Sequence, residues 1–187
     1  MALDDDADLV PAVGEYWFHP AENTPPPADE NDPAVEGYGD LGHTALEDPF
    51  AINGEGGEET VLGTWRNRAK RTVYTPRVDR VAFVLQQWTE ENYRLYYGAN
   101  AELDPVTGYV MVPDNPVPVT GTLWTLIRDG DETLPLWFPR VSIYRADDIT
   151  ADPQALMGLP VRATILGRSG QTGLYGLKPK SKPATSS

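Results

Sequence analysis

The residues that could perform catalysis or bind a metal are few and scattered. The chain has no cysteine, which excludes disulfides, cysteine-ligated zinc, iron–sulfur clusters and thiol nucleophiles. His19 and His43 lie far apart with no carboxylates at a matched metal-binding spacing, so we interpret them as ordinary surface histidines. Ser142 and Ser169 are outside any Gly-x-Ser-x-Gly turn of an activated serine. The sequence therefore predicts no catalytic residue, no metal site and no cofactor.

The glycine cluster at residues 54–57 is the one segment that invites a phosphate-binding interpretation. Glu55, Glu58 and Glu59 would repel a phosphate, and no Lys-Ser or Lys-Thr pair follows the glycines. A flexible loop explains the cluster better. A glycosidase needs only two carboxylates at the right separation, so an acidic-site hydrolase is a weak alternative, but no motif marks such a pair and we expect the protein not to be an enzyme.

Charge is distributed very unevenly along the 187 residues. The chain has 15 Lys and Arg against 28 Asp and Glu, a formal net charge of −13, which disfavours binding to nucleic-acid phosphates or to an anionic membrane surface. Residues 1–60 contain 16 of the acidic residues and no Lys or Arg, so every basic residue lies in 61–187. Such asymmetry is typical of an arm that pairs with another surface, or of a solvated, disordered N-terminus.

One basic segment, WRNRAKRTVYTPRVDR, follows the acidic arm. It could bind phosphate or form a solvated strand face. The charge distribution favours a third interpretation, in which it contacts acidic residues, for example those of a neighbouring copy's arm. Exposed ion pairs are worth only about 0–1 kcal/mol each, so they would guide register and association rate. The candidate inter-subunit contacts are Arg66, Arg68, Lys70, Arg71, Arg77, Glu55, Glu58 and Glu59.

Three parts are expected along the chain: an acidic, Pro- and Gly-rich N-terminal arm and loop (1–60), a β-sandwich or barrel (61–168) and a basic C-terminal tail (169–187). The stretch PAENTPPPADENDP excludes a helix or a central strand, because proline fixes φ and donates no hydrogen bond. The N-terminus has no signal-peptide pattern and no apolar run is long enough to span a bilayer, so we expect a soluble protein made in the cytoplasm.

Alternating apolar residues predict that the body is mainly β and antiparallel. Expected strands are VGEYWFHP in the arm, the long strand from Val78, and the segments 108–113, 119–131, 136–148 and 159–168, with a bulge or edge at Pro139. The tryptophans and tyrosines form either the core, which we favour, or an exposed surface for stacking on sugars or proteins. One short helix is expected at about 89–97, with Thr89 as N-cap and Gly98 as its end, and a single helical turn is expected from Asp152 to Gly158.

The order of segments between Gly42 and Gly98 resembles that of a known family. GHTALEDPFAINGEGGEE is followed by GTWRNRAKRTVYTP, then by the apolar strand VDRVAFVLQQW and by the helix TEENYRLYYG, whose aromatic-aromatic-glycine end is the most specific feature. LPVRATILG, after a linker with DPQ, also fits. About two thirds of the chain is thereby similar to the major tail (tail tube) proteins of long-tailed, siphovirus-type bacteriophages, especially those of actinobacterial hosts. The proline-rich stretch 20–36 has no counterpart in this layout.

The resemblance implies a structural virion protein that forms hexameric rings, stacked into a helical tail tube that encloses the tape-measure protein and conducts DNA to the host. It implies as partners further copies of the chain, the tape-measure, tail terminator and distal tail proteins, and passing viral DNA without specific binding, with no membrane. It places the protein in the virion tail after assembly in the host cytoplasm. We further hypothesise that the arm and the basic tail are mobile in the monomer and become ordered on assembly.

Two neighbouring interpretations remain open at this point. The first is a β-sandwich carbohydrate-binding or adhesin module, which would carry a coplanar strip of exposed aromatic residues and would form no rings. The second is an inner-tube protein of a related contractile machine.

Overall fold

The computed structural model describes residues 10–11, 13–45, 50–171 and 173–180 and is mainly antiparallel β with a single α-helix, which confirms the predicted fold class. The elements in chain order are β1 (Val13–His19), the 3-10 helix η1 (Pro33–Glu36), β2 (Gly39–Asp40), β3 (Ala51–Glu55), β4 (Glu59–Thr64), β5 (Asn67–Tyr74), β6 (Val78–Leu85), α1 (Glu90–Tyr97), β7 (Glu102–Leu103), β8 (Val110–Met111), β9 (Val119–Asp129), β10 (Glu132–Arg145), β11 (Leu159–Ile165) and β12 (Gly176–Leu177). None of the helices within these ranges is long and apolar enough to cross a membrane.

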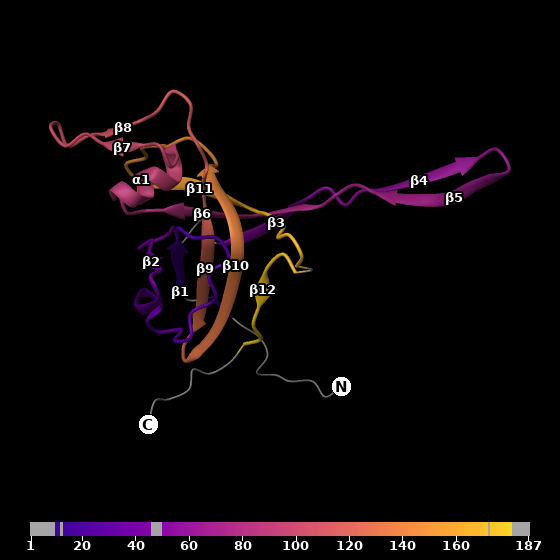
Figure 1. Ribbon diagram of the computed structural model, residues 1–187, viewed down its shortest axis with the longest axis horizontal. Coiled ribbons are helices and arrows are strands. Elements are labelled where there is room, and N and C mark those ends of the chain that lie inside the picture. Colours follow the sequence, from indigo (N-terminus) through magenta and orange to yellow (C-terminus); the bar gives the residue numbers. More distant parts are fainter. Residues whose placement is uncertain (1–9, 12, 46–49, 172, 181–187) are drawn as a thin grey trace.

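One eight-stranded sheet organises the body. Its order is β2-β1-β9-β10-β11-β6-β3, with β12 also paired to β10, and all its pairings are antiparallel. The pairs β4–β5 and β7–β8 are separate two-stranded hairpins. In Figure 1 the β4–β5 hairpin extends far beyond the rest of the molecule.

The sheet curls until its distant strands meet around one core. β1 and β6 are separated by three strands in the sheet order, yet Tyr16 and Phe83 stack with ring centroids 4.7 Å apart. The alternating pattern of β6 places Val81, Phe83 and Leu85 on the buried side, as the sequence predicts. Burying these aromatic and aliphatic side chains against one another is the main favourable contribution to folding.

The bend of β10 is located at the expected proline. The register between β9 and β10 shifts between Phe138 and Val141, which is a bulge around Pro139, and the curved strand is visible in Figure 1. A bulge bends the strand and frees backbone groups from the ladder. Here the freed carbonyl oxygen of Pro139 accepts a hydrogen bond from the Asn23 backbone N–H at 2.7 Å.

The helix begins and ends where the sequence predicts. The Thr89 hydroxyl accepts the Asn92 backbone N–H, and Gly98 ends the helix with a φ of +112°. Its tyrosines face the core: Tyr96 is buried, and Tyr93 and Tyr97 are half-buried and pack against the same cluster.

One local expectation is wrong, and two expected strands are shorter than predicted. The segment 152–158 is a turn and not a helix, because the Asp152 carboxylate accepts the Gln154 N–H and no further helical turn offsets the cost of nucleation. The strand expected at 108–113 is only Val110–Met111. The long strand from Val78 ends at Leu85, before the N-cap of α1.

The buried phenol of Tyr16 should make the fold less stable at alkaline pH. Burial raises the pKa of Tyr16 to about 12, against 10.0 ordinarily, so the folded state holds the phenolic proton more tightly than the unfolded state. We expect the free energy of unfolding to be unaffected by this group below pH 10 and to fall by about 2 kcal/mol as pH rises from 10 to 12. Denaturant unfolding across pH 8–12 measures this loss. Tyr16→Phe should have a shallower decline, and an identical decline in both proteins would contradict the assignment.

Candidate interaction surfaces

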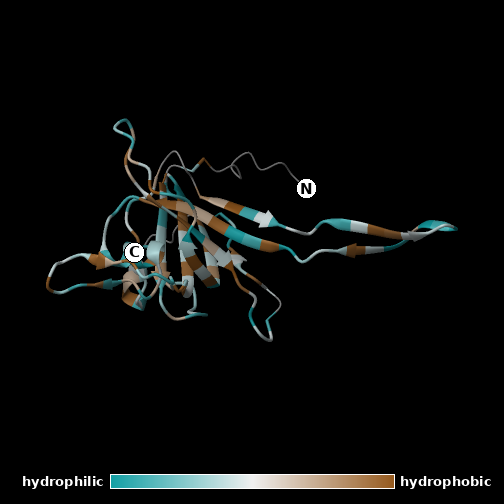
Figure 2. Cartoon of the chain, turned by 90° about the horizontal axis from the view of Figure 1, so that it is seen from above, coloured by the Kyte–Doolittle hydropathy of each residue, from teal (hydrophilic) through white to brown (hydrophobic). Residues whose placement is uncertain are grey.

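The β4–β5 hairpin is fully exposed along its whole length. Every residue of both strands is exposed, and Figure 2 shows the hairpin well outside the body with apolar and polar residues mixed along it. Trp65, in its turn, has a relative exposure of 104%. Isolated two-stranded hairpins are marginally stable in water, so a hairpin with this much exposed apolar surface indicates a partner that covers it.

The base of the hairpin is firmly closed. The Gly57 N–H bonds to the Thr75 carbonyl, the Thr75 N–H to the Glu58 carbonyl, and the Glu58 N–H to the Thr75 hydroxyl. Gly56 has a φ of +88°, and a Cβ there would lie 2.2 Å from the Pro76 carbonyl oxygen, so a glycine is required. The cluster that could be taken for a phosphate loop is thus the structural base of a projecting hairpin.

The charges of the hairpin are segregated along its length. Glu58 and Glu59 lie near the base, whereas the outer part carries four cations, Arg66, Arg68, Lys70 and Arg71, with no acidic residue between residues 60 and 74. None of these four cations forms a salt bridge with a residue that the structure describes. Their charge is therefore available to another surface.

The two other candidate contacts, Arg77 and Glu55, form ion pairs within the chain. Arg77 Nε lies 2.6 Å from Asp79 Oδ1, and Glu55 pairs with Arg80. The Arg80 guanidinium lowers the pKa of the Glu55 carboxyl below its usual value. These two candidates are brought to the base of the hairpin and are not joined to the four cations at its outer part.

Ion pairs join the acidic N-terminal segment to the basic remainder of the same chain. Four of them cross this boundary: Glu15–Arg128, Glu22–Arg140, Glu30–Lys178 and Glu55–Arg80. The charge asymmetry along the sequence is thus partly balanced within the folded chain. The cations at the outer part of the hairpin form no such ion pair with a described acidic residue.

A row of tryptophans lies on the face of the sheet opposite the main core. Trp17, Trp124 and Trp137 are register partners on β1, β9 and β10, and they pack with Tyr38 and Leu126 into a second apolar cluster. Trp124 is 1% exposed. Core packing is therefore correct for Trp124, whereas the same expectation is wrong for Trp65.

The proline-rich segment 20–38 covers this tryptophan row, and we refer to it as the strap. Tyr38 donates its hydroxyl to the Pro25 carbonyl at 2.7 Å, and Trp137 donates its indole N–H to the Thr24 carbonyl at 2.9 Å. Burial raises the pKa of Tyr38 to about 12. The strap is therefore part of the folded body, although sequence reasoning could assign it no role.

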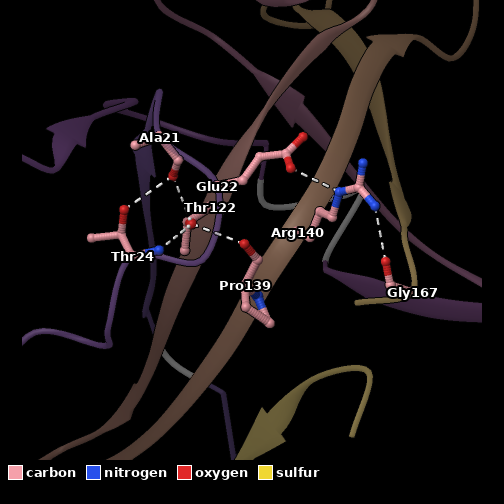
Figure 3. Close-up of polar contacts among 7 residues, drawn as sticks. All are labelled: Ala21, Glu22, Thr24, Thr122, Pro139, Arg140 and Gly167. Carbon is pink, nitrogen blue, oxygen red and sulfur yellow. Dashed lines mark hydrogen bonds and ion pairs between the residues drawn. The ribbon is translucent and has the colours of Figure 1, made fainter. Parts of the chain in front are cut away.

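Thr122 and Arg140 hold the start of the strap on the sheet (Figure 3). The Thr122 hydroxyl accepts the Thr24 N–H and lies 2.9 Å and 3.0 Å from the carbonyl oxygens of Ala21 and Pro139. Arg140 donates through Nε to Glu22 at 2.8 Å and through Nη1 to the Gly167 carbonyl at 3.0 Å.

The hypothesis of a mobile arm and tail is wrong for their described parts. Tyr16 and Phe18 of the arm are buried in the core. In the basic tail, β12 pairs with β10 and Lys178 pairs with Glu30. Residues 1–9, 12, 46–49, 172 and 181–187 lie outside the described residues, and the division of the chain at residues 60 and 168 stays a prediction.

No metal-binding group stands out within the described part of the chain, where no three His, Cys, Asp or Glu residues are arranged to hold an ion. His19 has a local role instead. Its Nδ1 accepts the Ala21 N–H at 3.0 Å, and its ring packs edge-on against Tyr38. The most exposed feature of the described structure is the projecting hairpin.

Comparison with known proteins agrees with a role in assembly. The sequence profile of the phage tail tube protein family matches residues 1–184. The chain belongs to the phage tail tube protein family. It is 32% identical over 198 aligned positions to "Major tail protein Gp23" of Mycobacterium phage D29, covering 96% of this chain and 98% of that protein. It is 33% identical to the protein of the same name from Mycobacterium phage L5, covering 89% and 88%.

Membership in the tail tube family confirms the resemblance to proteins of actinobacterial phages. The protein is a phage tail structural protein, and its place is the virion tail. Sequence reasoning named the basic residues of the hairpin as candidate contacts, which stays a prediction, and it did not include Trp65 or the exposed Val61, Leu62 and Tyr74 among them. The sequence does contain a signal for their exposure: the segment between the glycine cluster and Val78 lacks the sustained apolar alternation of a half-buried strand.

Loss of the Thr122 hydroxyl should release the strap. In Thr122→Val the Thr24 N–H loses its acceptor, and an unsatisfied buried group costs about 1–3 kcal/mol. We expect that loss in the free energy of unfolding, together with faster proteolytic cleavage within residues 20–36. Thr120→Val, at an exposed position on the same strand, is the matched control and should leave both quantities nearly unchanged. Equal cleavage rates in the two variants would contradict the role of Thr122.

Proposed function

We propose that this tail protein self-assembles into hexameric rings that stack as a helical tail tube, enclose the tape-measure protein and conduct viral DNA. The observation that carries the proposal is the β4–β5 hairpin, which is exposed throughout and ends in an exposed tryptophan beside four cations. A surface of this kind is stabilised only when another molecule covers it. In a tube of identical subunits, the covering molecule is another copy.

Contacts of this kind favour an open assembly. A hairpin that reaches from one copy to a different surface on the next forms a heterologous contact, and such contacts produce rings where the rotation closes and filaments where it does not. The candidate inter-subunit residues are those of the hairpin and its base: Arg66, Arg68, Lys70, Arg71, Arg77, Glu55, Glu58 and Glu59. The tail terminator and distal tail proteins would contact the two ends of the tube.

The net charge is compatible with DNA passage. The formal charge of −13 for each copy supports a negative lumen that would repel phosphates, so that DNA slides without specific binding. Assembly would take place in the host cytoplasm, before the tube joins the virion.

The carbohydrate-binding or adhesin alternative lacks its discriminating feature in the described residues. The tryptophan row on the sheet is covered by the strap. The exposed aromatic residues are dispersed: Trp65 lies in the β4–β5 turn and Tyr74 at the opposite end of that hairpin, whereas Trp88 precedes α1 and Tyr109 belongs to the β7–β8 hairpin. They form no strip on one sheet face.

Electron microscopy of the purified full-length chain over a range of concentrations tests the proposal. We expect rings with a central hole, or tubes, and light scattering should show the mass rising with concentration. A chain that stays strictly monomeric at high concentration would contradict unaided self-assembly and would favour the binding-module alternative.

Removing the cations of the hairpin should weaken assembly without weakening the fold. In Arg66→Gln/Arg68→Gln/Lys70→Gln/Arg71→Gln, the loss of several exposed ion pairs of about 0–1 kcal/mol each should raise the concentration needed for assembly about tenfold or more. The melting temperature of the monomer should be unchanged. Thr72→Gln, an exposed neutral change on β5, is the control. A difference between variant and parent that persists at 1 M salt would contradict an electrostatic contribution, since charges are then screened beyond about 3 Å.

A further inference from the structure

A groove of about 620 Å³ lies at the end of β6 opposite the hairpin. Its walls include Val84 and Gln86 at the end of β6, Pro160 at the start of β11, and the connection between β10 and β11. The hairpin leaves the body at the other end of the same strand, where Val78 pairs with Glu55 of β3.

The chemistry of this groove is acidic with an apolar rim. Asp147, Asp148 and Asp152 line it, and none of its lining residues is Lys or Arg. Leu156 lies on its wall with a relative exposure of 80%. None of the three carboxylates forms a salt bridge with a described residue. The groove therefore offers carboxylates that no salt bridge among the described residues pairs, beside a surface on which an apolar ring can pack.

The turn region of the hairpin, residues 64–71, is complementary to this groove in both respects. It presents the exposed indole of Trp65, and it carries Arg66, Arg68, Lys70 and Arg71 without an acidic residue. Among the described Lys and Arg residues, these four and Arg145 form neither a salt bridge nor a cation–π contact; each of the others forms one.

The turn region and the groove of one chain face away from each other. The hairpin points outward from the body (Figures 1 and 2), and residues 78–83 of β6 separate its base from the groove, which begins at Val84. The complementary surfaces can therefore meet only between two copies, and each copy keeps one free surface of each kind.

We propose that residues 64–71 of one copy dock into the groove at Asp147, Asp148 and Asp152 of the next copy. Trp65 packs on the Leu156 side, and the cations face the three carboxylates. The proposal rests on the proposed function and adds to it the surface that receives the hairpin. It makes the contact between neighbouring subunits a repeated head-to-tail contact.

Cysteine cross-linking of the assembled full-length protein tests this contact, because the natural chain has no cysteine to interfere. Asn67→Cys places a thiol in the hairpin and Gln154→Cys places one in the groove, both at exposed positions. The doubly substituted protein is assembled, oxidised and separated on a non-reducing denaturing gel. We expect a ladder of multimers that disappears on reduction, with a yield at least tenfold above that of either single variant.

A second double-cysteine variant tests whether cross-linking is specific to the groove or occurs equally at another acidic part of the surface. Asn67→Cys/Thr107→Cys places the second thiol on the β7–β8 hairpin, near Asp104. Tubes that form normally, with no more cross-linking at Gln154→Cys than at Thr107→Cys, would overturn the groove contact and leave the proposed function intact. A parent chain that forms neither rings nor tubes would remove the proposed function, and the groove contact with it.

Charge reversal provides an independent readout. Arg68→Asp/Arg71→Asp and Asp148→Arg/Asp152→Arg should each raise the concentration needed for assembly by tenfold or more, because each set leaves like charges facing each other. A mixture of the two variants should co-assemble, because both contacts between unlike variants are complementary: the reversed hairpin meets the reversed groove, and the unchanged hairpin meets the unchanged groove. Mixing without any association of the two variants would contradict the proposal.

Discussion

The tryptophan row across β1, β9 and β10 imposes the constraint on which much of the remaining structure depends. One face of a sheet can be buried by curling, and here curling brings Tyr16 of β1 onto Phe83 of β6. The other face of the same strands carries Trp17, Trp124 and Trp137, and among the described residues no α-helix packs into their cluster. Exposed apolar surface of that size is costly in water, so the chain needs a second cover.

The strap supplies that cover with few apolar residues of its own. A proline-rich segment loses less backbone freedom on folding than an ordinary loop, since φ is already fixed. Its polar backbone is satisfied by the Thr122 hydroxyl, the Trp137 indole and the carbonyl freed by the bulge at Pro139. Once the strap is in place, Glu22 and Glu30 meet Arg140 and Lys178. The same arrangement therefore orders part of the basic C-terminal tail.

The β4–β5 hairpin differs from the tryptophan row, because no part of the chain that the structure describes covers it. A tail tube subunit must be stable alone and must also bind its neighbours, and this molecule divides the two requirements between separate regions. The body buries most of its aromatic residues and pairs part of the charge of its acidic segment internally. The hairpin keeps Trp65 and its cations exposed, which in the proposed assembly leaves them to contact another copy.

Sequence reasoning predicted what depends on neighbouring residues in the chain. The alternation in β6 and β11, the cap at Thr89 and the bulge at Pro139 were all predicted correctly, because local periodicity and capping chemistry produce them. The basic residues of the hairpin were also identified, from their types alone. The exposure of Trp65, the cover that the strap provides for Trp124 and the opposite positions of hairpin and groove along β6 were decided by the tertiary structure. These features depend on which strands pair and which face remains open, and a local pattern carries no information about contacts between residues a hundred positions apart.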